Sequence, residues 1–279
     1  GNYKVALEYF DRSLALYKEL DDKNSIGMSL KNIVTTYRKK GDLDRALEYS
    51  ERALAIYEEI GNTLRIYTLL ETISGVYKDI GDFDKALVYR KKIIAMYKDS
   101  PDPRVKLEWV FNWLGWAYFT MGEFDKSIKN YNMMLQLVTE LKEKEEIANV
   151  NSILGFSYFY NENHVKALEY FEKSSKEQLE VNNEVNLPTK IYLLLTKKTL
   201  GKDYNVAEIL TIVKDEEKIR NYYIDYYGLY KLLEERSYLE KAYNDINSKA
   251  DAMKDEFKEK YFKFSVQKQI IEEYHKVNS

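Results

Sequence analysis

The chain has 279 residues, of which 45% are apolar and 32% charged, a balance typical of a globular or repeat protein with ample core material. The absence of cysteine excludes disulfides, thiolate metal sites and cysteine nucleophiles. A formal net charge of −3 argues against a nucleic-acid-binding surface, which is normally basic. No run of about 18 apolar residues indicates a membrane span, and the scarcity of proline and glycine favours an all-helical chain.

One motif recurs along the chain from its first residue. It reads GNYKVALEY at 1–9, GDLDRALEY at 41–49, GDFDKALVY at 81–89, GEFDKSI at 122–128 and, more weakly, ENHVKALEY at 162–170. Its small central residue, which recurs about every 40 residues, is Ala6, Ala46, Ala86, Ser127 and Ala167. Degenerate copies centre on Ala207 and Ala242. A constant period over so many copies predicts a repeat protein.

A second motif precedes each copy of the first. Its clearest form is Leu30-x-x-Ile33-Val34-x-x-Tyr37, an apolar stripe with the spacing of one helix face. It returns at 70–77, at 111–118 and, with a polar first residue, at 151–158. Its small central residue lets a partner helix approach closely. The glycine after each stripe is placed to end a helix, and the acidic residue after that glycine can begin the next one.

The two motifs predict alternating helices, A and B. A helices are expected near 24–39, 63–79, 104–120, 144–160, 184–200 and 218–235. B helices are expected near 2–20, 42–60, 82–98, 123–141, 163–181, 203–215 and 237–250. Pro101 and Pro103 fall in a predicted loop and Pro188 near a helix start, where proline is tolerated. Because residue 1 opens on a B helix, we expect the natural protein to extend further at its N-terminus.

The segment from 249 to 279 is predicted to form one long amphipathic helix. Its apolar seam, with spacings of four and three, is Phe257, Tyr261, Phe264, Lys268, Ile271 and His275. We expect it either to cap the last repeat, as solenoid ends require, or to act as a linker to another domain. The predicted division is a repeat domain at 1–250 and a capping or linker helix at 251–279.

The combined pattern resembles the tetratricopeptide repeat: a large apolar residue, a Leu-Gly pair and a tyrosine, followed by Gly-Asp-Phe and then alanine. The resemblance covers nearly the whole chain and is strongest over residues 1–182. It implies an all-α, right-handed α-solenoid of about six to seven helical hairpins with a long C-terminal helix. A period near 40 rather than 34 residues is similar to the long-repeat subtype of kinesin light chains, Rap-type regulators and bacterial repeat-containing sensors.

Catalytic chemistry has little support in the sequence. The histidines are His164 and His275, and His164 occupies a column otherwise filled by Tyr3, Leu43 and Phe83, so we interpret it as structural. No phosphate-binding loop, nucleophile elbow or paired metal-ligating histidines occur. We predict a protein without enzymatic activity, without catalytic residues, and without a metal or other cofactor.

Binding is better supported than catalysis. The resemblance implies that A helices line a concave groove, and that residues between their core positions face it. Aligned by the repeat, that groove is basic toward its N-terminal end and aromatic in its middle. The predicted site residues are Lys31, Thr35, Arg38, Lys78, Trp109, Asn112, Trp113, Trp116, Phe119, Phe156, Phe159 and Tyr160.

Such a groove suits a peptide with an acidic or carboxylate end and large apolar side chains. The family's known carboxylate clamp uses lysine and asparagine at defined groove positions. It is incomplete here, because Lys31 and Asn112 occupy the same repeat position in two different repeats. Trp113 and Phe159 are equally compatible with packing between neighbouring A helices, whereas groove exposure is favoured for Trp116 and Phe156. The tyrosines that recur on the B helices, such as Tyr9, Tyr49 and Tyr89, are interpreted as structural.

Three functions therefore remain in view. The leading prediction is a module that binds a protein segment or peptide in its groove. The alternatives are a sensory or regulatory domain of a larger bacterial signalling protein, and a structural scaffold that self-associates through its hairpin ends. The expected partner is a protein or peptide, with no nucleic acid and no direct membrane insertion, and the expected location is the cytoplasm.

Overall fold

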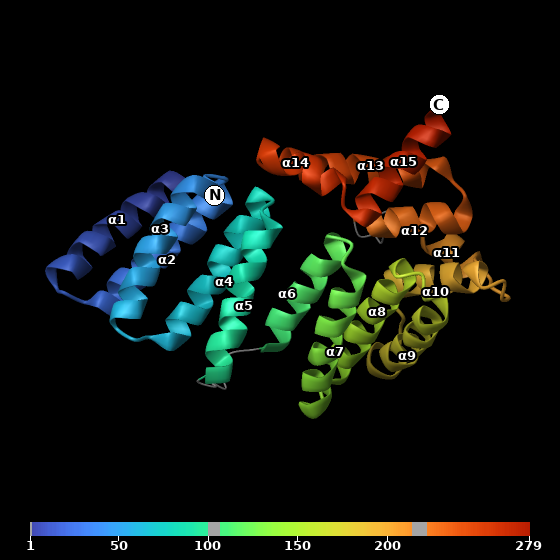
Figure 1. Ribbon diagram of the computed structural model, residues 1–279, viewed down its shortest axis with the longest axis horizontal. Helices are drawn as coiled ribbons and strands as arrows, with labels where there is room; N and C mark the ends of the chain where they lie inside the picture. The colour runs from blue at the N-terminus through green and yellow to red at the C-terminus, as the bar shows by residue number, and fades with distance from the viewer. Residues whose placement is uncertain (1, 100–106, 214–221) are drawn as a thin grey trace. The chain divides into compact units, whose positions relative to one another are not determined.

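The computed structural model of the chain describes residues 2–99, 107–213 and 222–279, and all regular structure within these ranges is helical (Figure 1). The helices fall into two compact units, residues 1–106 and residues 107–279. We call them unit 1 and unit 2 and describe each separately. None of the described helices combines the length and apolar character needed to cross a membrane.

Unit 1 consists of one B helix followed by two helical hairpins. Its helices are α1 (Tyr3–Glu19), α2 (Lys23–Lys40), α3 (Leu43–Glu59), α4 (Thr63–Ile80) and α5 (Phe83–Asp99). Each helix packs against the next one along the chain, and α2 also contacts α4. The apolar stripe of α2 supplies Leu30 and Ile33 to a core shared with Tyr57, Leu69 and Ile73. The predicted A and B helices of this unit are confirmed to within one or two residues.

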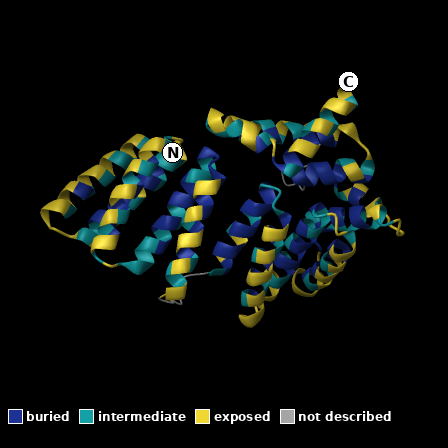
Figure 2. Ribbon diagram, in the orientation of Figure 1, coloured by how far each residue is buried: buried dark blue, intermediate teal, exposed yellow. Residues whose placement is uncertain are grey.

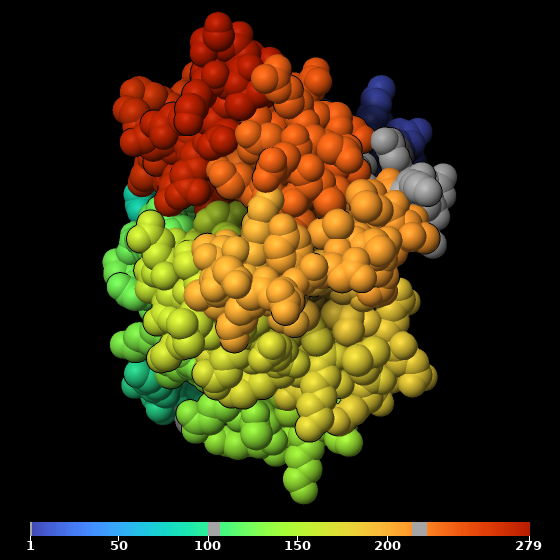
Figure 3. All heavy atoms as spheres, turned by 90° about the vertical axis from the view of Figure 1, so that its right-hand side faces the viewer, coloured from blue at the N-terminus to red at the C-terminus, as the bar shows by residue number. Residues whose placement is uncertain are grey.

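Unit 2 begins with two regular hairpins and continues into a less regular C-terminal part. The hairpins are α6 (Leu107–Thr120) with α7 (Phe124–Glu140), and α8 (Lys144–Tyr160) with α9 (His164–Asn182). The helices that follow are α10 (Leu187–Thr199), α11 (Ala207–Ile212), α12 (Tyr223–Leu233), α13 (Arg236–Asp251), α14 (Asp255–Phe262) and α15 (Ser265–Asn278). In Figure 3, α10 to α12 lie between the end of the second hairpin and α13 to α15.

The turns within the repeats follow from the motif residues. Gly41 and Gly81 have φ of 84° and 97°, a left-handed conformation that glycine adopts without steric cost. The next residue then caps the following helix: the Asp42 and Asp82 carboxylates accept hydrogen bonds from the amides of Arg45 and Lys85. This arrangement confirms the predicted ends of α2 and α4, whereas Glu123, which follows Gly122, makes no side-chain capping hydrogen bond.

The small residue at the centre of each A helix also has its predicted role. A Cβ added at Gly115 would lie 2.7 Å from the ring of Tyr131, and one added at Gly155 would lie 2.6 Å from the ring of Phe171. Both rings belong to the B helix of the same hairpin. Only glycine permits these aromatic side chains to lie directly on the A-helix backbone.

The recurring tyrosines form a stack in the α2–α3, α4–α5 and α8–α9 hairpins. The last tyrosine of an A helix lies against a tyrosine of the following B helix, with ring centroids 5.5 Å apart for Tyr37 and Tyr49 and 5.2 Å apart for Tyr158 and Tyr170. A lysine or arginine lies over these rings, such as Arg52 at 4.6 Å from the Tyr49 centroid. Tyr49, Tyr89 and Tyr170 are therefore packed as predicted, whereas Tyr9, which was also predicted to be structural, is 64% exposed.

Two predictions about the C-terminal part are wrong. The expected B helix at 203–215 is the short α11, and its alignment residue Ala207 is exposed. The single long helix expected from 249 is broken, because α13 ends at Asp251 and the backbone is extended again at Lys254 and Phe264. The breaks let Phe264, at the start of α15, lie buried instead of continuing a seam. The predicted loop at Pro101 and Pro103 lies outside the described residues.

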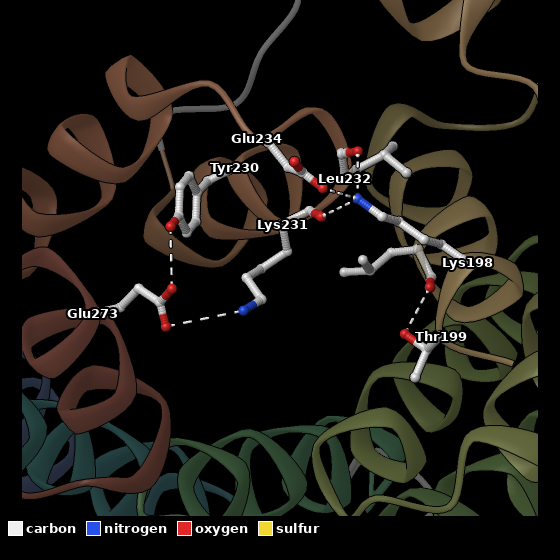
Figure 4. A network of polar contacts seen from close by, with 8 residues as sticks. Lys198, Thr199, Tyr230, Lys231, Leu232, Glu234 and Glu273 are labelled. Atoms are coloured by element: carbon white, nitrogen blue, oxygen red, sulfur yellow. Dashed lines mark hydrogen bonds and ion pairs between the residues drawn. The ribbon is translucent and has the colours of Figure 1, made fainter. Parts of the chain in front are cut away.

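The C-terminal helices are tied together by polar contacts as well as packing. Nearly all of α12 is buried (Figure 2). The Lys198 ammonium of α10 donates to the carbonyls of Lys231 and Leu232 and to the Glu234 carboxylate, thereby capping the C-terminus of α12 (Figure 4). From the other side, the Tyr230 hydroxyl of α12 donates to Glu273 of α15 over 3.1 Å. The helix α12 is therefore held between α10 and α15.

Candidate peptide-binding faces

The basic residues predicted in unit 1 are partly neutralised by acidic neighbours. The Arg38 Nε donates to the Asp79 carboxylate over 2.6 Å, and the Lys78 ammonium lies 3.5 Å from the same carboxylate. The Arg38 guanidinium lies against Gly75, where an added Cβ would be 2.7 Å from Cζ. The absence of a side chain at Gly75 therefore leaves room for the guanidinium of Arg38. The Thr35 hydroxyl donates to the Lys31 carbonyl within α2.

A second ion pair in unit 1 escaped the sequence analysis. Arg90 is only 9% exposed, and its Nη1 donates to the Glu71 carboxylate over 2.8 Å while its Nε donates to the Ser74 hydroxyl. Arg90 occupies the B-helix position at which unit 2 has the buried rings Tyr131 and Phe171. The sequence did contain a sign of this ion pair, because Arg90 is a charged residue at a repeat position that packs in the core.

Two cations of unit 1 are not neutralised in this way. Lys31 on α2 and Arg65 on α4 are half-buried, and neither has an ion-pair partner among the described residues. Burial lowers the pKa of Lys31, and the nearby positive charge of Arg65 lowers it further, whereas Glu71 acts in the opposite direction. Arg65 was not among the predicted site residues.

In unit 2, the start of α6 presents the predicted aromatic surface. Trp109 is 61% exposed, Asn112 is exposed and Trp113 is half-buried. Spacings of three and four place these three side chains on one side of the helix. A large exposed indole beside an amide is the kind of surface that protein partners bind.

The third tryptophan has a different environment. The Trp116 indole is half-buried, its ring centroid lies 6.1 Å from that of Trp113, and its Nε1 donates a 3.4 Å hydrogen bond to the Tyr222 hydroxyl. Tyr222 precedes α12 and is itself covered by the Lys249 ammonium, 4.0 Å from its ring centroid. Trp116 therefore joins α6 to the C-terminal helices, in contrast to the predicted groove exposure.

Phe119 and Tyr160 do not form an exposed surface. Phe119 is 5% exposed and packs edge-on against Phe124 and Tyr160. The Tyr160 hydroxyl is 2.6 Å from that of Tyr192, which donates to the carbonyl of Ile224. Burial raises the pKa of Tyr160. Both predicted ligand contacts are core residues: Phe119 packs among aromatic side chains, and Tyr160 is connected through Tyr192 to the backbone of α12.

Phe156 and Phe159 belong to the same aromatic cluster. Their ring centroids lie 4.5 Å and 5.2 Å from that of Tyr192, and Phe156 also packs against Phe171. Both side chains remain half-buried. The structure thus gives them packing partners between A helices while leaving part of each ring accessible.

The histidine His164 is a packing residue in this structure. Its ring centroid lies 5.0 Å from that of Phe159, at the start of α9. No group of acidic or histidine side chains with metal-binding geometry occurs within the described ranges.

This combination of paired antiparallel helices, glycine-capped turns and partly exposed A-helix faces defines a helical-repeat interaction module. The tetratricopeptide repeat family model matches residues 1–59, and a second model of the same repeat matches residues 110–133. No curated protein sequence matches the chain. The two matches show tetratricopeptide repeats at these residues, which make up less than half of the chain.

Solved structures share this fold at low sequence identity. BtubC (BKLC) from P. vanneervenii has 16% identity and a TM-score of 0.63, over 78% of this chain and 91% of that one. A signal transduction ATPase with numerous domains from Pyrococcus horikoshii, which has a tetratricopeptide repeat sensor, has 18% identity and a TM-score of 0.65, over 97% of this chain and 42% of that one. The apo form of RapI has 14% identity and a TM-score of 0.54, over 96% and 99%.

Proposed function

We propose that this protein is a non-enzymatic module that binds a segment of a partner protein through the exposed residues of its A helices. The observation that carries the proposal is Trp109, which is 61% exposed on the first turn of α6 beside Asn112. Its counterparts in the repeats before and after are Met28, Thr68 and Asn149, so the repeat architecture does not require an indole at this position. A tryptophan that is mostly exposed at a position where the repeat requires no aromatic residue favours a contact residue.

The proposed contact surface is smaller than the predicted set. In unit 2 it comprises Trp109, Asn112 and Trp113, with the accessible edges of Phe156 and Phe159. In unit 1 it comprises the α2 and α4 residues Lys31, Thr35, Arg38 and Lys78. Trp116, Phe119 and Tyr160 contribute by holding α6 and α8 in place. The aromatic surface suits large apolar side chains of a bound segment, and the basic surface suits acidic ones.

The test uses a displayed library of random peptides, from which binders to the full chain are selected. The affinity of one selected peptide is then measured for the native protein and for Trp109→Ala. We expect the substitution to weaken binding by about tenfold or more, as for an interface hot spot, without lowering the melting temperature. Val165→Ala, a change at an exposed position of α9, is the matched control. Equal affinity for all three proteins would contradict the proposal.

A regulatory role within a larger protein is the second candidate. It is favoured by the likeness to the tetratricopeptide repeat sensor of the signal transduction ATPase, of which this chain covers 42%. The hydrogen bond between Trp116 and Tyr222 offers a route by which events at α6 reach the C-terminal helices. If it operates, peptide binding changes hydrogen exchange in α12 of the native protein and does so less in Tyr222→Phe. Unchanged exchange in α12 would contradict it.

Self-association remains the third candidate. Tyr9, Leu16 and Leu20, on α1 and at its C-terminal end, are all more than half exposed, with Tyr9 at 64%. Exposed apolar residues of this kind are typical of contact surfaces. Light scattering over a range of concentrations tests this proposal, and a mass that stays monomeric would contradict it.

A further inference from the structure

Helix α1 has an apolar face that is exposed to solvent. Its residues are spaced by four, seven and four along the helix and its C-terminal end, and they are Val5, Tyr9, Leu16 and Leu20. These spacings place them on one side of the helix. All four are at least 40% exposed, and Leu20 reaches 73%. A contiguous exposed apolar face of this kind is typical of a contact surface.

The other B helices show what covers this face within the repeat. In α3 the equivalent positions are Tyr49, Ile56 and Ile60, and all three are partly buried against the core of unit 1. Helix α3 packs between α2 and α4, and α7 and α9 likewise pack between the A helix before them and the helix after them. Among the described helices, α1 has extensive contacts with α2 only. The exposed face of α1 is therefore the face that an A helix covers in the other hairpins.

Phe10 of α1 specifies a small residue in a covering helix. It occupies the repeat position of Tyr131 in α7 and Phe171 in α9. Each of these rings lies on a glycine of the preceding A helix, Gly115 and Gly155, where an added Cβ would be no more than 2.7 Å from the ring. A side chain at either glycine would displace the ring. A helix that covers Phe10 in the same way carries glycine opposite it.

Tyr17 specifies a second small residue. It occupies the repeat position of Tyr57 in α3, whose ring lies on Gly27 of α2, with Cζ 2.8 Å from an added Cβ. Tyr57 is fully buried there, whereas Tyr17 is only partly buried. Because the two helices of a hairpin run antiparallel, the small residues occur in reverse order on the covering helix. The one opposite Tyr17 comes seven residues before the one opposite Phe10.

Tyr9 specifies an aromatic residue near the end of the covering helix. It occupies the repeat position of Tyr49, which stacks on Tyr37, the last tyrosine of α2, with centroids 5.5 Å apart. Arg12 lies 6.0 Å from the Tyr9 centroid, as Arg52 lies over the ring of Tyr49. The cation of the stack is thus present at α1 already. With 64% of its surface exposed, Tyr9 has room for the second ring.

The charge at the start of α1 distinguishes the covering helix from the A helices of this chain. The first turn of α1 contains Lys4 and no acidic residue, whereas the equivalent positions of α3, α5 and α7 carry Asp44, Asp84 and Asp125. Helix α2, which covers α3, ends in three basic residues. The end of an antiparallel covering helix lies beside Lys4, so acidic residues there complement α1. The A helices α2, α4, α6 and α8 of a second copy are already packed on their own B helices.

We propose that α1 binds an amphipathic helix of a partner protein, which lies antiparallel to α1. The partner helix carries glycine opposite Tyr17, a second glycine seven residues later opposite Phe10, a tyrosine three residues after that against Tyr9, and an acidic last turn. Bound in this way, it completes the helical hairpin of which α1 is the B helix. The site goes beyond the proposed function, because it lies on a B helix and not on the exposed residues of the A helices.

Two blocked peptides are the probes. The first has the sequence of residues 23–40 with Val34→Gly, Lys39→Glu and Lys40→Glu, and so contains the proposed pattern. The second has the same two glutamates but carries Gly27→Leu and Val34→Leu. Calorimetric titration into the full chain measures affinity, and amide shifts in nuclear magnetic resonance locate the bound peptide. We expect the first peptide to shift α1 and the second to bind at least tenfold more weakly, although leucine favours a helix more than glycine does. Equal affinities, no binding of the first peptide, or shifts in α3 instead of α1 would overturn the proposal.

Variants of the protein separate this site from other surfaces. Tyr9→Ala removes an exposed ring, so we expect it to weaken binding of the first peptide by about tenfold without lowering the melting temperature. The controls Tyr204→Ala, at another exposed tyrosine, and Trp109→Ala should leave the affinity unchanged. A loss with Trp109→Ala but not with Tyr9→Ala would place the peptide on α6 and overturn the site. A dimer in light scattering that Tyr9→Ala converts to a monomer would show that a second copy occupies this face, and would overturn the assignment to a partner helix.

Discussion

The same repeat positions are charged in unit 1 and aromatic in unit 2. Where unit 1 places Arg90 against Ser74, unit 2 places the ring of Tyr131 on Gly115. Ion pairs such as Arg38 with Asp79 link the A helices of unit 1, whereas tilted and edge-on aromatic contacts around Tyr192 link those of unit 2. The repeat therefore specifies backbone geometry and helix contacts, and leaves the chemistry between A helices free to differ.

The two units should differ most at alkaline pH. Burial raises the pKa of Tyr131, Tyr160, Tyr192 and Tyr223 in unit 2. In the unfolded chain these hydroxyls ionise near pH 10, so the unfolded state releases protons that the folded state retains, and unit 2 loses stability as pH rises above about 10. Each pKa unit of such a shift is worth about 1.4 kcal/mol for each tyrosine.

Unit 1 has fewer such groups, and one of its groups acts in the opposite direction. The pKa values of Tyr57 and Tyr89 are also raised, but that of Lys31 is lowered, so unit 1 gains stability as pH rises through the pKa of Lys31. All tryptophans lie on α6, so their fluorescence reports unit 2 alone. We expect it to change at a lower alkaline pH than hydrogen exchange in α2 to α4. The reverse order would contradict the comparison.

Within unit 2, replacing a core aromatic residue should lower the free energy of unfolding much more than replacing an exposed one. Phe119→Ala removes a ring that is 5% exposed and leaves a cavity beside Phe124 and Tyr160. We expect it to lower the free energy of unfolding by about 3–5 kcal/mol. Trp109→Ala should change it by no more than about 0.5 kcal/mol. Urea titrations followed by circular dichroism measure both, and similar losses would show that Trp109 is a core residue.

Loss of the buried ion pair of unit 1 should lower the free energy of unfolding more than loss of an exposed ion pair. Glu71→Gln removes the carboxylate that binds the buried Arg90 over 2.8 Å, and we expect a loss of about 1–3 kcal/mol in the free energy of unfolding. The control is Glu169→Gln on α9, because the pair of Glu169 with Lys173 is half exposed on both sides and such pairs contribute at most about 1 kcal/mol. Equal losses would show that water reaches Arg90 more readily than its small exposed fraction implies.

The sequence predicted most of the fold because the repeat is local. The period of about 40 residues placed α1 to α9, their glycine caps and their central small residues correctly. It failed at α11 and after Asp251, where the motif degenerates and long-range packing decides. Phe264 illustrates the limit: its spacing fits a helical seam, but burial at the start of α15 requires a break in the helix.

The candidate site was less predictable, for a related reason. Aligning the repeats shows which residues lie between A helices. It does not show whether a helix from a distant part of the chain covers those residues. Trp116, Phe119 and Tyr160 occupy repeat positions that the resemblance assigns to a groove. In the structure, Trp116 contacts Tyr222, Phe119 packs against Phe124 and Tyr160, and Tyr160 contacts Tyr192. Arg65 was missed because the sequence does not show that it is half-buried and lies near Lys31. Trp109 could be identified because no equivalent position carries an aromatic residue.

Photo-cross-linking with a selected peptide tests the central claim most directly. A benzoylphenylalanine introduced in place of Asn112, beside Trp109 on α6, is compared with one in place of Asn132, an exposed residue of α7. If the exposed A-helix face binds the partner segment, the peptide cross-links from position 112 and not from position 132, and the cross-link is lost with Trp109→Ala. Efficient cross-linking from position 132 with none from position 112 would place the binding surface on the B helices and contradict the account.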